Sequence, residues 1–507
     1  MCKSAAVVAA ALFYACFEVD KISEKLYNKI VRLCPEIKVK RGMLMPESLQ
    51  EKEYSKSKLI GFCAQYFSQY GQAPLAYVHS FGCQQNVSDG EKLKGQLADV
   101  GFGFTNDHTQ ARLIIFNTCA VRENAEDKVF GTLGDLKHFK EQNPDTIIGV
   151  CGCMAQQKHV AEKIRSTYRQ VDLVFGTFAY NEFYQMLWEV ISNKKRVFNT
   201  SENSFEISED FKQIRDDKLR AFVPIMYGCN NFCTYCIVPY VRGRERSRKP
   251  EAVIQEVRQL IDSGYKEITL LGQNVNSYSY GFSQLLKQID KIEGKFRIRF
   301  MSSHPKDASR ELIDTILESE KICKCLHLPV QSGCDRILKA MNRHYTKAQY
   351  LDIINYARQK SPEFSFSTDL IVGFPGETYE EFCETKDIIK QVKYDNIYSF
   401  VYSRRSGTKA AELEDNISDK QKGLWLRELL LEQREITSKW FSRYVGQTVE
   451  VLVEGEGRTG EGYLTGKNDA GVIVEIKGDK KYIGEFVRVR ITKAMNWALE
   501  GELVEDK

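Results

Sequence analysis

Short strand-like runs alternate with helical patterns over most of this chain, and this alternation constrains the fold more than any other feature. In the first stretch the runs lie at 76–81, 113–116, 146–150 and 171–175. A helix-like segment follows each run, and a capping box of Ser88 and Glu91 predicts that the first of these helices begins at Ser88. Buried parallel strands have this pattern, so we expect a doubly wound parallel α/β domain.

The alternation resumes after a polar segment, Asn199 to Asp217, which has no sustained periodicity and is expected to be a linker. Six candidate strands follow, at 222–227, 267–271, 297–301, 325–330, 366–373 and 396–402. Helical patterns separate them, for example at 250–263, 346–359 and 378–391. Six βα units are too few for an eight-stranded barrel and predict a partial (β/α)6 barrel. A long helical pattern at 417–444 ends this region.

The two ends of the chain have a different character. β-rich runs at 448–453, 471–476 and 485–491, with glycines between them, predict a small antiparallel β-barrel of a type that often binds RNA. The N-terminal stretch reads as helices without a chemical motif. The expected architecture is therefore a multidomain α/β chain, with a helical extension at 1–73, an α/β domain at 74–193, a linker at 194–214, a partial barrel at 215–445 and a β-barrel at 446–507.

The composition is that of an ordinary globular protein. The 507 residues are 43% hydrophobic and 28% charged, which excludes a collagen-like or wholly disordered chain. The net charge of +4 is too small to imply nucleic-acid binding by itself. The apolar run from Ala5 to Phe17 is shorter than the ~20 residues that span a bilayer. We expect a packing helix there rather than a signal peptide, and a cytoplasmic protein without membrane association.

The fifteen cysteines carry the first chemical signal, because clustered cysteines in a large Lys/Glu-rich chain bind metal or do chemistry more often than they form disulfides. Cys229, Cys233 and Cys236 form a C-x3-C-x2-C motif directly after a predicted strand. Three thiolates can hold three irons of a cubane cluster and leave the fourth iron open. A structural zinc site would need four ligands, and no second pair lies nearby.

A second set of cysteines is defined by strand ends and not by spacing. Cys83, Cys119 and Cys153 each follow one of the predicted strands of the first α/β domain. The carboxyl ends of adjacent parallel strands converge on one crevice, so these residues predict a second three-thiolate site. Spacing alone leaves open that they are unrelated loop cysteines. Cys151 is a possible competing ligand, although its place inside a strand favours a buried thiol.

The local sequences resemble the methylthiotransferases, a family of radical S-adenosylmethionine (SAM) enzymes. The N-terminal likeness lies in Phe81-Gly-Cys-Gln-Gln-Asn86, Asn117-Thr-Cys-Ala-Val-Arg-Glu-Asn-Ala-Glu126 and Gly152-Cys-Met-Ala-Gln156. The radical SAM likeness lies in the run from Gly228 to Arg248, in 271–278, in 328–333 and in 369–377. The C-terminal barrel resembles the RNA-binding TRAM domain. The likeness covers residues 74–507.

The resemblance implies an enzyme with SAM and two [4Fe–4S] clusters as cofactors, one cluster on each set of three cysteines. One SAM would methylate a sulfur at the auxiliary cluster of Cys83, Cys119 and Cys153. A second SAM, cleaved at the cluster of Cys229, Cys233 and Cys236, would yield the radical that takes hydrogen from C2 of an adenine. A low-potential electron donor and a sulfur source are further implied partners, and we expect a monomer.

The forms Asn117-Thr-Cys-Ala-Val-Arg-Glu123 and Leu271-Gly-Gln-Asn-Val-Asn-Ser-Tyr278 resemble those of members that act on N6-isopentenyladenosine at position 37 of tRNA. Two alternatives within the family are threonylcarbamoyladenosine of tRNA and an aspartate of a ribosomal protein. An alternative of another class is a non-catalytic iron–sulfur or zinc RNA-binding protein, which would retain metal without cleaving SAM.

Further site predictions follow from position next to these motifs. The resemblance and the strand ends suggest SAM contacts for Tyr235, Gly272, Gln273, Asn274, Asp369 and Glu377, with free backbone amides in the turn before Glu377. The basic run after the cysteine loop suggests contacts with tRNA phosphates for Arg242, Arg244, Arg246 and Arg248. The alternative for this run is a solvated basic loop.

Overall fold

A computed structural model describes residues 47–121, 123–202, 207, 209, 212–458 and 460–504. The expected helix at Ala5–Phe17 lies outside the described residues. The chain divides into two compact units, Met1–Tyr54 and Ser55–Lys507, and helix α3 (Glu47–Tyr70) contains the boundary. All contacts described below lie within the second unit. Within the described ranges, no helix is long and apolar enough to cross a bilayer.

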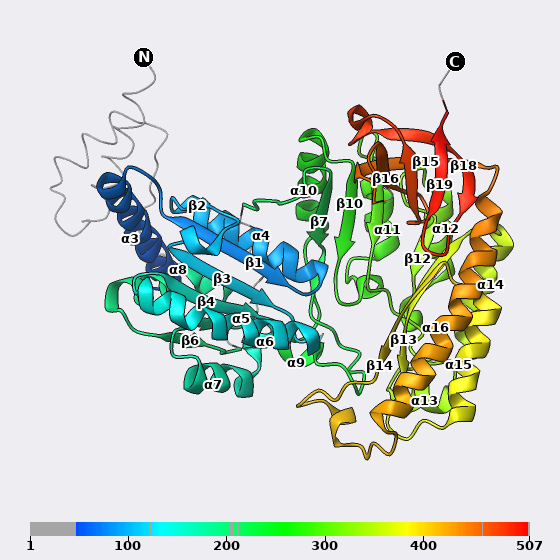
Figure 1. Cartoon of the computed structure of the whole chain (residues 1–507), viewed down its shortest axis with the longest axis horizontal. Coiled ribbons are helices and arrows are strands. Elements are labelled where there is room, and N and C mark those ends of the chain that lie inside the picture. Colours follow the sequence, from blue (N-terminus) through cyan, green and yellow to red (C-terminus); the bar gives the residue numbers. More distant parts are fainter. Residues whose placement is uncertain are drawn as a thin grey trace. The chain divides into compact units, whose positions relative to one another are not determined.

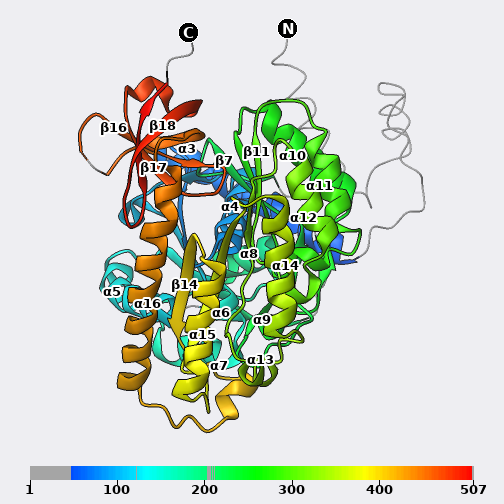
Figure 2. The ribbon, with the colours of Figure 1, turned by 90° about the vertical axis from the view of Figure 1, so that its right-hand side faces the viewer.

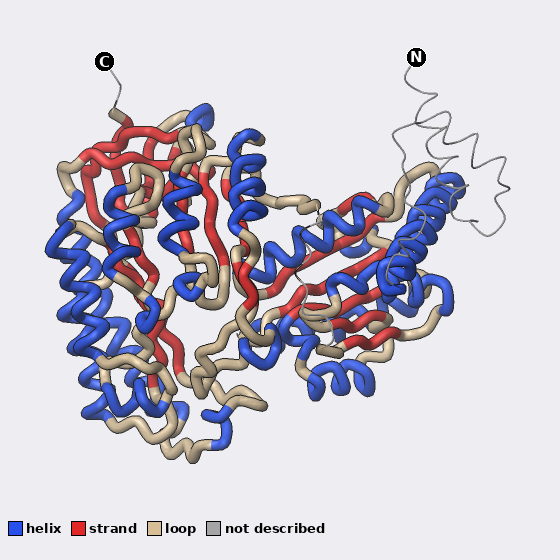
Figure 3. The backbone as a smooth tube through the Cα atoms, turned by 180° about the vertical axis from the view of Figure 1, so that it is seen from behind, coloured by secondary structure: helices blue, strands red, loops and turns tan. Residues whose placement is uncertain are grey.

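The first domain of this unit is built on a six-stranded parallel sheet (Figures 1 and 3). Its strands run in the order β2 (Gly103–Phe104), β1 (Leu75–Phe81), β3 (Leu113–Thr118), β4 (Ile147–Gly152), β5 (Leu173–Phe175) and β6 (Val197–Asn199). Side chains alternate between the two faces. Leu113 and Ile115 pack with α4 (Gln84–Asp99) and α8 (Phe183–Asn193), whereas Ile114 and Phe116 pack with α5 (Glu123–Gln142) and α7 (Lys158–Thr167). Burial on both faces confirms the doubly wound prediction.

Two details of this domain differ from the prediction. Helix α4 begins directly after Cys83, so the capping box at Ser88 is wrong; Ser88 is buried within the helix, and Glu91 pairs with Arg215 at 3.3 Å. Strand β6 pairs with β5 inside the segment that was expected to be linker. It has only three residues and leaves no recognisable alternation in the sequence.

The second domain is a partial barrel of two three-stranded parallel sheets. The first has the order β11 (Arg297–Phe300), β10 (Glu267–Leu271), β7 (Arg220–Pro224), and the second has the order β12 (Cys325–His327), β13 (Ser365–Val372), β14 (Asn396–Val401). A parallel bridge between Ile298 and Ile322 lies where the two sheets meet. The expected six-strand partial barrel is confirmed.

Helices cover the outer side of these strands (Figure 2). They are α10 (Pro250–Asp262), α11 (Phe282–Asp290), α12 (Arg310–Glu318), α13 (Asp335–Ala340), α14 (Lys347–Lys360), α15 (Tyr379–Val392) and α16 (Asp419–Phe441). Capping boxes at Thr346 and Thr378 fix the first turns of α14 and α15. The large apolar core between strands and helices includes Val223, Ile268 and Leu370.

The last domain is a closed five-stranded barrel. Its strands are β15 (Thr448–Glu456), β16 (Tyr463–Asn468), β17 (Ile473–Lys477), β18 (Phe486–Ala494) and β19 (Leu499–Leu503). The prediction of an antiparallel barrel is wrong for one pair, because β19 runs parallel to β17 while it pairs antiparallel with β18. Buried arginines attach this barrel to the partial one: Arg297 donates to the carbonyl oxygens of Lys467 and Glu450 at 2.7 and 2.8 Å.

Candidate active site: two groups of three cysteines

The structure brings Cys83, Cys119 and Cys153 together at the carboxyl end of the first sheet. Cys83 caps α4 after β1, Cys119 follows β3, and Cys153 begins the short helix α6 (Cys153–Gln156) directly after β4. A hydrogen bond from Cys119 is the main reason that the pKa of Cys83 falls to about 6, and the same bond raises the pKa of Cys119. We call these three residues the first cysteine group.

Close backbone packing makes this convergence possible. The side-chain amide Nδ2 of Asn86 donates to Oδ1 of Asn117 and to the carbonyl oxygen of Thr118, both at 3.1 Å. These bonds connect the turn of Cys83 to that of Cys119. Gly82 has φ +138°, and a Cβ there would lie 2.3 Å from Cβ of Cys119. Only glycine permits this approach of the two turns.

Cys229, Cys233 and Cys236 form the second cysteine group, in the loop between β8 (Met226–Tyr227) and α9 (Val238–Arg242). All three thiols influence one another electrostatically, and burial raises the pKa of Cys229 to about 11 and that of Cys236 to about 12. Neighbouring side chains hold the loop. Asn342 donates to the carbonyls of Asn231 and Phe232 at 3.1 and 3.0 Å, and Gln273 accepts from the amide of Gly228 at 2.6 Å.

Each group offers three thiols, which matches the donor set of a [4Fe–4S] cluster with one open iron. Among the described residues no three His, Cys, Asp or Glu side chains are placed to hold a single metal ion. Each thiolate of a cubane binds a different iron, so the three sulfurs of such a site need not meet at one point. Cys151 does not join the first group; it is fully buried in the apolar core with Leu173 and Phe175.

A set of buried polar side chains lies next to the second cysteine group and was only partly found from the sequence. Asn274, predicted as a SAM contact, donates to Asp307 at 2.7 Å, and Lys306 donates to Asn231 at 2.9 Å. The sequence analysis missed Asn231 together with Ser303 and His304, which lie three and four residues after the end of β11. Their position just past a strand end is the signal that identifies them.

Several of these side chains have an atom without a partner. Nδ2 of Asn231, Oδ1 of Asn274, Oγ of Ser303 and Nε2 of His304 are buried and make no hydrogen bond with any described residue. Burial is the main cause that lowers the pKa of His304 to about 2, so this imidazole is neutral. Unsatisfied buried polar groups carry a cost that a polar ligand removes. The arrangement therefore suits a small molecule with both donors and acceptors.

Two of the four arginines predicted to bind phosphate are buried and paired with carboxylates in the structure. Arg242 is 5% exposed and pairs with Asp89 at 2.6 Å; Arg248 is 6% exposed and pairs with Glu209 and Glu256. Arginines of a charged run can thus be buried when each guanidinium group pairs with a carboxylate.

The other two arginines of the run remain nearer to solvent. Arg244 is exposed and lies over the ring of Phe232, 4.4 Å from its centre. Arg246 is half-buried and donates to the carbonyl of Arg242 at 2.9 Å.

The remaining predicted SAM contacts lie in the loop of the second cysteine group, directly after β10 and within β13. Tyr235 packs with the apolar cluster of Cys334 and Phe374, and Gly272 leaves room for Met226, whose Cγ would lie 2.6 Å from an added Cβ. Asp369 lies in β13, 3.5 Å from His327.

Glu377 has a different placement from the one expected. Its Oε2 accepts from the amides of Gly373 and Phe374 at 2.7 and 3.1 Å. These two amides of the turn are therefore already bound by Glu377 in the structure.

Comparisons with known proteins agree with this architecture. Residues 75–176 match the Uncharacterized protein family UPF0004, residues 223–389 the Radical SAM superfamily, and residues 442–504 the TRAM domain. A radical SAM methyltransferase from Kitasatospora setae, TsrM, shares the fold over 66% of this chain and 77% of its own, with a TM-score of 0.50 and 13% identity. These findings define the class of the fold: it is that of the radical SAM superfamily, preceded by a UPF0004 region and followed by a TRAM domain.

Curated relatives narrow this class. The chain is 47% identical over 435 residues to the tRNA-2-methylthio-N(6)-dimethylallyladenosine synthase of Thermoanaerobacter pseudethanolicus, covering 85% of this chain and 92% of the relative. It is 45% identical over 467 residues to the synthase of that name from Clostridioides difficile, covering 91% and 98%. The chain belongs to this family of methylthiotransferases, as the motifs predicted.

Proposed function

We propose that this chain attaches a methylthio group to C2 of N6-isopentenyladenosine at position 37 of tRNA, with two SAM and two [4Fe–4S] clusters. The first cysteine group would hold the auxiliary cluster and the second would hold the radical SAM cluster. When bound, the clusters and SAM supply the carbon-centred radical chemistry and the sulfur for transfer. The names of the curated relatives support this substrate.

The observation that carries the proposal is that helix α9, which follows the second cysteine group, contacts the first one. Helix α9 begins two residues after Cys236, and its Val241 shares a small apolar cluster with Ala120 and Cys153 of the first group. Arg242, at the end of the same helix, donates to Sγ of Cys153 at 3.1 Å. One short segment therefore extends from the second group to the first. An enzyme that activates a carbon at one cluster and delivers sulfur from the other requires the two to lie close together.

We assign the polar contacts with SAM to the unsatisfied side chains next to the second group. Asn231, Asn274, Ser303 and His304 offer both donors and acceptors that have no partner in the part of the chain that the structure describes. The amino, carboxylate and ribose groups of SAM need both kinds of partner. Gln273 and Gly272 would act indirectly, since the side chain of Gln273 fixes the loop of the second group through Gly228.

The face of β14 that points away from the helices suits the modified base. Ile397 is buried in the core, whereas Tyr398 and Phe400 on the opposite face are 45% and 51% exposed. The ring of His327 meets that of Tyr398 edge-on at 5.7 Å, and Asp369 lies beside both. Aromatic side chains on a sheet are a common platform for an unpaired base. An apolar prenyl group would gain from the same surface.

The remaining assignments concern partners and domains. We propose that the barrel at 446–507 contacts tRNA, since Arg488, Arg490 and Lys493 lie exposed on β18. Arg244 is the member of the basic run that remains available for a phosphate. We propose the domain bounds 1–73, 74–193, 215–445 and 446–507. We further propose that the protein is a cytoplasmic monomer that takes electrons and sulfur from other proteins.

The test is an anaerobic reaction of the iron-reconstituted protein with reductant, SAM and tRNA that contains isopentenyladenosine, followed by mass spectrometry of the nucleosides. We expect a methylthio adduct that disappears in Cys229→Ala and in Cys153→Ala. Cys151→Ala is the matched control, because this thiol is buried in the core, and it should retain the adduct. In the same assay Phe400→Ala should raise the KM for tRNA.

Two other results would change the assignment. SAM cleavage without an adduct on isopentenyladenosine, but with one on threonylcarbamoyladenosine or on the ribosomal aspartate, would replace the substrate. Full cluster loading without any SAM cleavage would reject the enzyme and favour an iron–sulfur RNA-binding protein.

A further inference from the structure

Arg242 is the residue of α9 whose charged side chain contacts the first cysteine group. Its Nε donates to Sγ of Cys153 at 3.1 Å, and one of its terminal nitrogens donates to Asp89 at 2.6 Å. Arg242 and Asp89 are each about 5% exposed. The guanidinium also acts electrostatically on Cys83, whose pKa it helps to lower. A buried cation from one domain is thus placed against two thiols of the other.

The carboxylate of Asp89 opposes this charge from inside the first domain. Asp89 lies one turn and a half after Cys83 on α4, and Gln85 donates to its other oxygen at 3.1 Å. This carboxylate acts electrostatically on Cys83 and Cys153 in the direction opposite to that of Arg242. The first cysteine group therefore lies beside a cation and an anion that are held in fixed positions.

We propose that Arg242 and Asp89 are positioning residues that set the reduction potential of the cluster on Cys83, Cys119 and Cys153. This inference rests on the proposed assignment of a cluster to these cysteines. Reduction adds one negative charge to the cluster. A buried guanidinium that donates to a cluster sulfur stabilises the added charge, and a buried carboxylate destabilises it. Arg242 raises the potential and Asp89 lowers it.

The opposite signs separate this role from a structural one. Loss of either member of a buried ion pair leaves the other uncompensated and destabilises the site. A merely structural pair would therefore weaken cluster binding in both variants, and it would not move the potential in two directions. The potential is the quantity to measure.

The experiment uses the full-length protein in which Cys229, Cys233 and Cys236 are all replaced by alanine, so that one cluster remains. Redox titration followed by electron paramagnetic resonance gives its midpoint potential. We expect Arg242→Gln to lower the ratio of reduced to oxidised cluster at a fixed poise about tenfold, which is about 59 mV for one electron. Asp89→Asn should raise this ratio by a similar factor, and Arg242→Lys should lie close to the parent.

Arg248→Gln is the matched control, because Arg248 is an equally buried arginine of the same run that pairs with Glu209 and Glu256 and contacts no cysteine of either group. It should leave the potential unchanged. If Arg242→Gln fails to bind iron, Asp89→Asn and Arg242→Lys decide the question. Potentials that stay constant, or that move in the same direction in Arg242→Gln and Asp89→Asn, would overturn the inference. A parent that binds no cluster would instead reject the proposed function.

Discussion

The buried carboxyl group of Glu377 makes the stability of the folded protein depend on pH. Burial is the main cause that raises its pKa from 4.5 to about 7, and it outweighs the two amide hydrogen bonds from Gly373 and Phe374. Among the described residues, its Oε1 has no hydrogen-bond partner. The protonated form is therefore favoured by the folded state.

This raised pKa predicts a pH-dependent difference between the parent and Glu377→Gln. The stability that the protonated carboxyl contributes is complete below about pH 4.5 and is lost as the pH rises through about 7. The loss amounts to ~3 kcal/mol at most. Glutamine does not titrate, so we expect the melting temperature of Glu377→Gln to rise relative to the parent between pH 5.5 and pH 8. A difference that is constant over this range would contradict the prediction.

Neighbouring Glu381 provides a control of opposite sign. A hydrogen bond from Arg336 is the main cause that lowers its pKa, so its contribution is present at neutral pH and is lost only as the pH falls below 4.5. Between pH 5.5 and pH 8 the difference between Glu381→Gln and the parent should therefore stay constant.

The surroundings of the cysteines were predicted from the sequence better than those of the arginines. A cysteine at the carboxyl end of a parallel strand has its position determined by the sheet, and so Cys83, Cys119 and Cys153 were expected to meet. An arginine side chain is long, and its environment depends on partners that are distant in the chain. Nothing in the basic run revealed that Asp89 would receive Arg242 or that Glu256 would receive Arg248.

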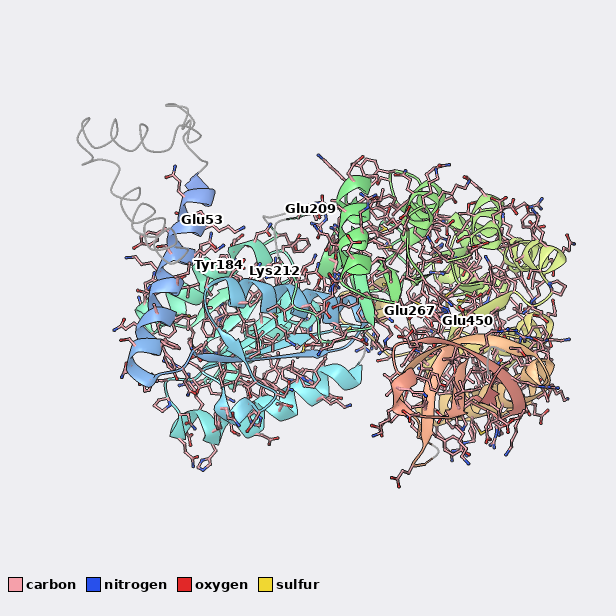
Figure 4. The ribbon with its side chains drawn as sticks, turned by 90° about the horizontal axis from the view of Figure 1, so that it is seen from above. Glu53, Tyr184, Glu209, Lys212, Glu267 and Glu450 are labelled. Carbon is pink, nitrogen blue, oxygen red and sulfur yellow. The ribbon has the colours of Figure 1, made fainter. Side chains whose placement is uncertain are left out.

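Helix α4 is one of the elements through which the first domain contacts the second. Glu91 pairs with Arg215, Lys92 contacts the hydroxyl of Tyr227, and Gly95 faces the backbone of Lys212. A Cβ at Gly95 would lie 1.6 Å from the carbonyl oxygen of Lys212. Figure 4 labels Lys212 in the segment that crosses between the domains.

This contact predicts a large effect of Gly95→Ala. The added methyl group would force the segment at Lys212 away from α4, so we expect a lower melting temperature and faster proteolysis within residues 199–217. Gly131→Ala in α5 is the matched control, because nothing lies within 4 Å of its Cβ position. Alanine is favoured over glycine by ~1 kcal/mol within a helix, so the control should be slightly stabilised. Equal behaviour of the two variants would refute the prediction.

Elements with an unbroken apolar pattern were predicted well, and elements whose pattern is interrupted were not. Strand runs such as 267–271 and helices such as 378–391 agree with β10 and α15 to within one or two residues. β16 and β19 were missed because glycine and polar residues interrupt their alternation. Barrel closure, rather than local preference, fixes these two strands.

Two arginines join the β-barrel to the partial barrel, and Figure 4 labels Glu267 and Glu450 at this junction. Arg299 pairs with Glu267 at 2.8 Å and donates to the carbonyl of Asn468 at 2.8 Å. Arg297 donates to the carbonyl oxygens of Lys467 and Glu450. These guanidinium groups are buried, so the carbonyls they bind would lose their partners if the barrel separated.

We expect Arg297→Ala to loosen the β-barrel without affecting the cysteine groups. Loss of two charge-assisted hydrogen bonds costs ~1.5–3 kcal/mol each. Hydrogen exchange in β15 should therefore accelerate and tRNA affinity should fall, while SAM cleavage without tRNA is retained. Lys295→Ala removes an exposed ion pair with Glu450, worth about 0–1 kcal/mol, and should change little. Unchanged exchange in Arg297→Ala would show that other contacts hold the barrel.

The role of α4 as a contact element has a consequence for recombining domains. Asp89, Glu91 and Lys92 all belong to the first domain by sequence, yet their partners Arg242, Arg215 and Tyr227 belong to the second. A chimaera that takes its first domain from a relative would therefore inherit half of each pair. A functional exchange would need a crossover within the barrel after Arg242 rather than in the linker.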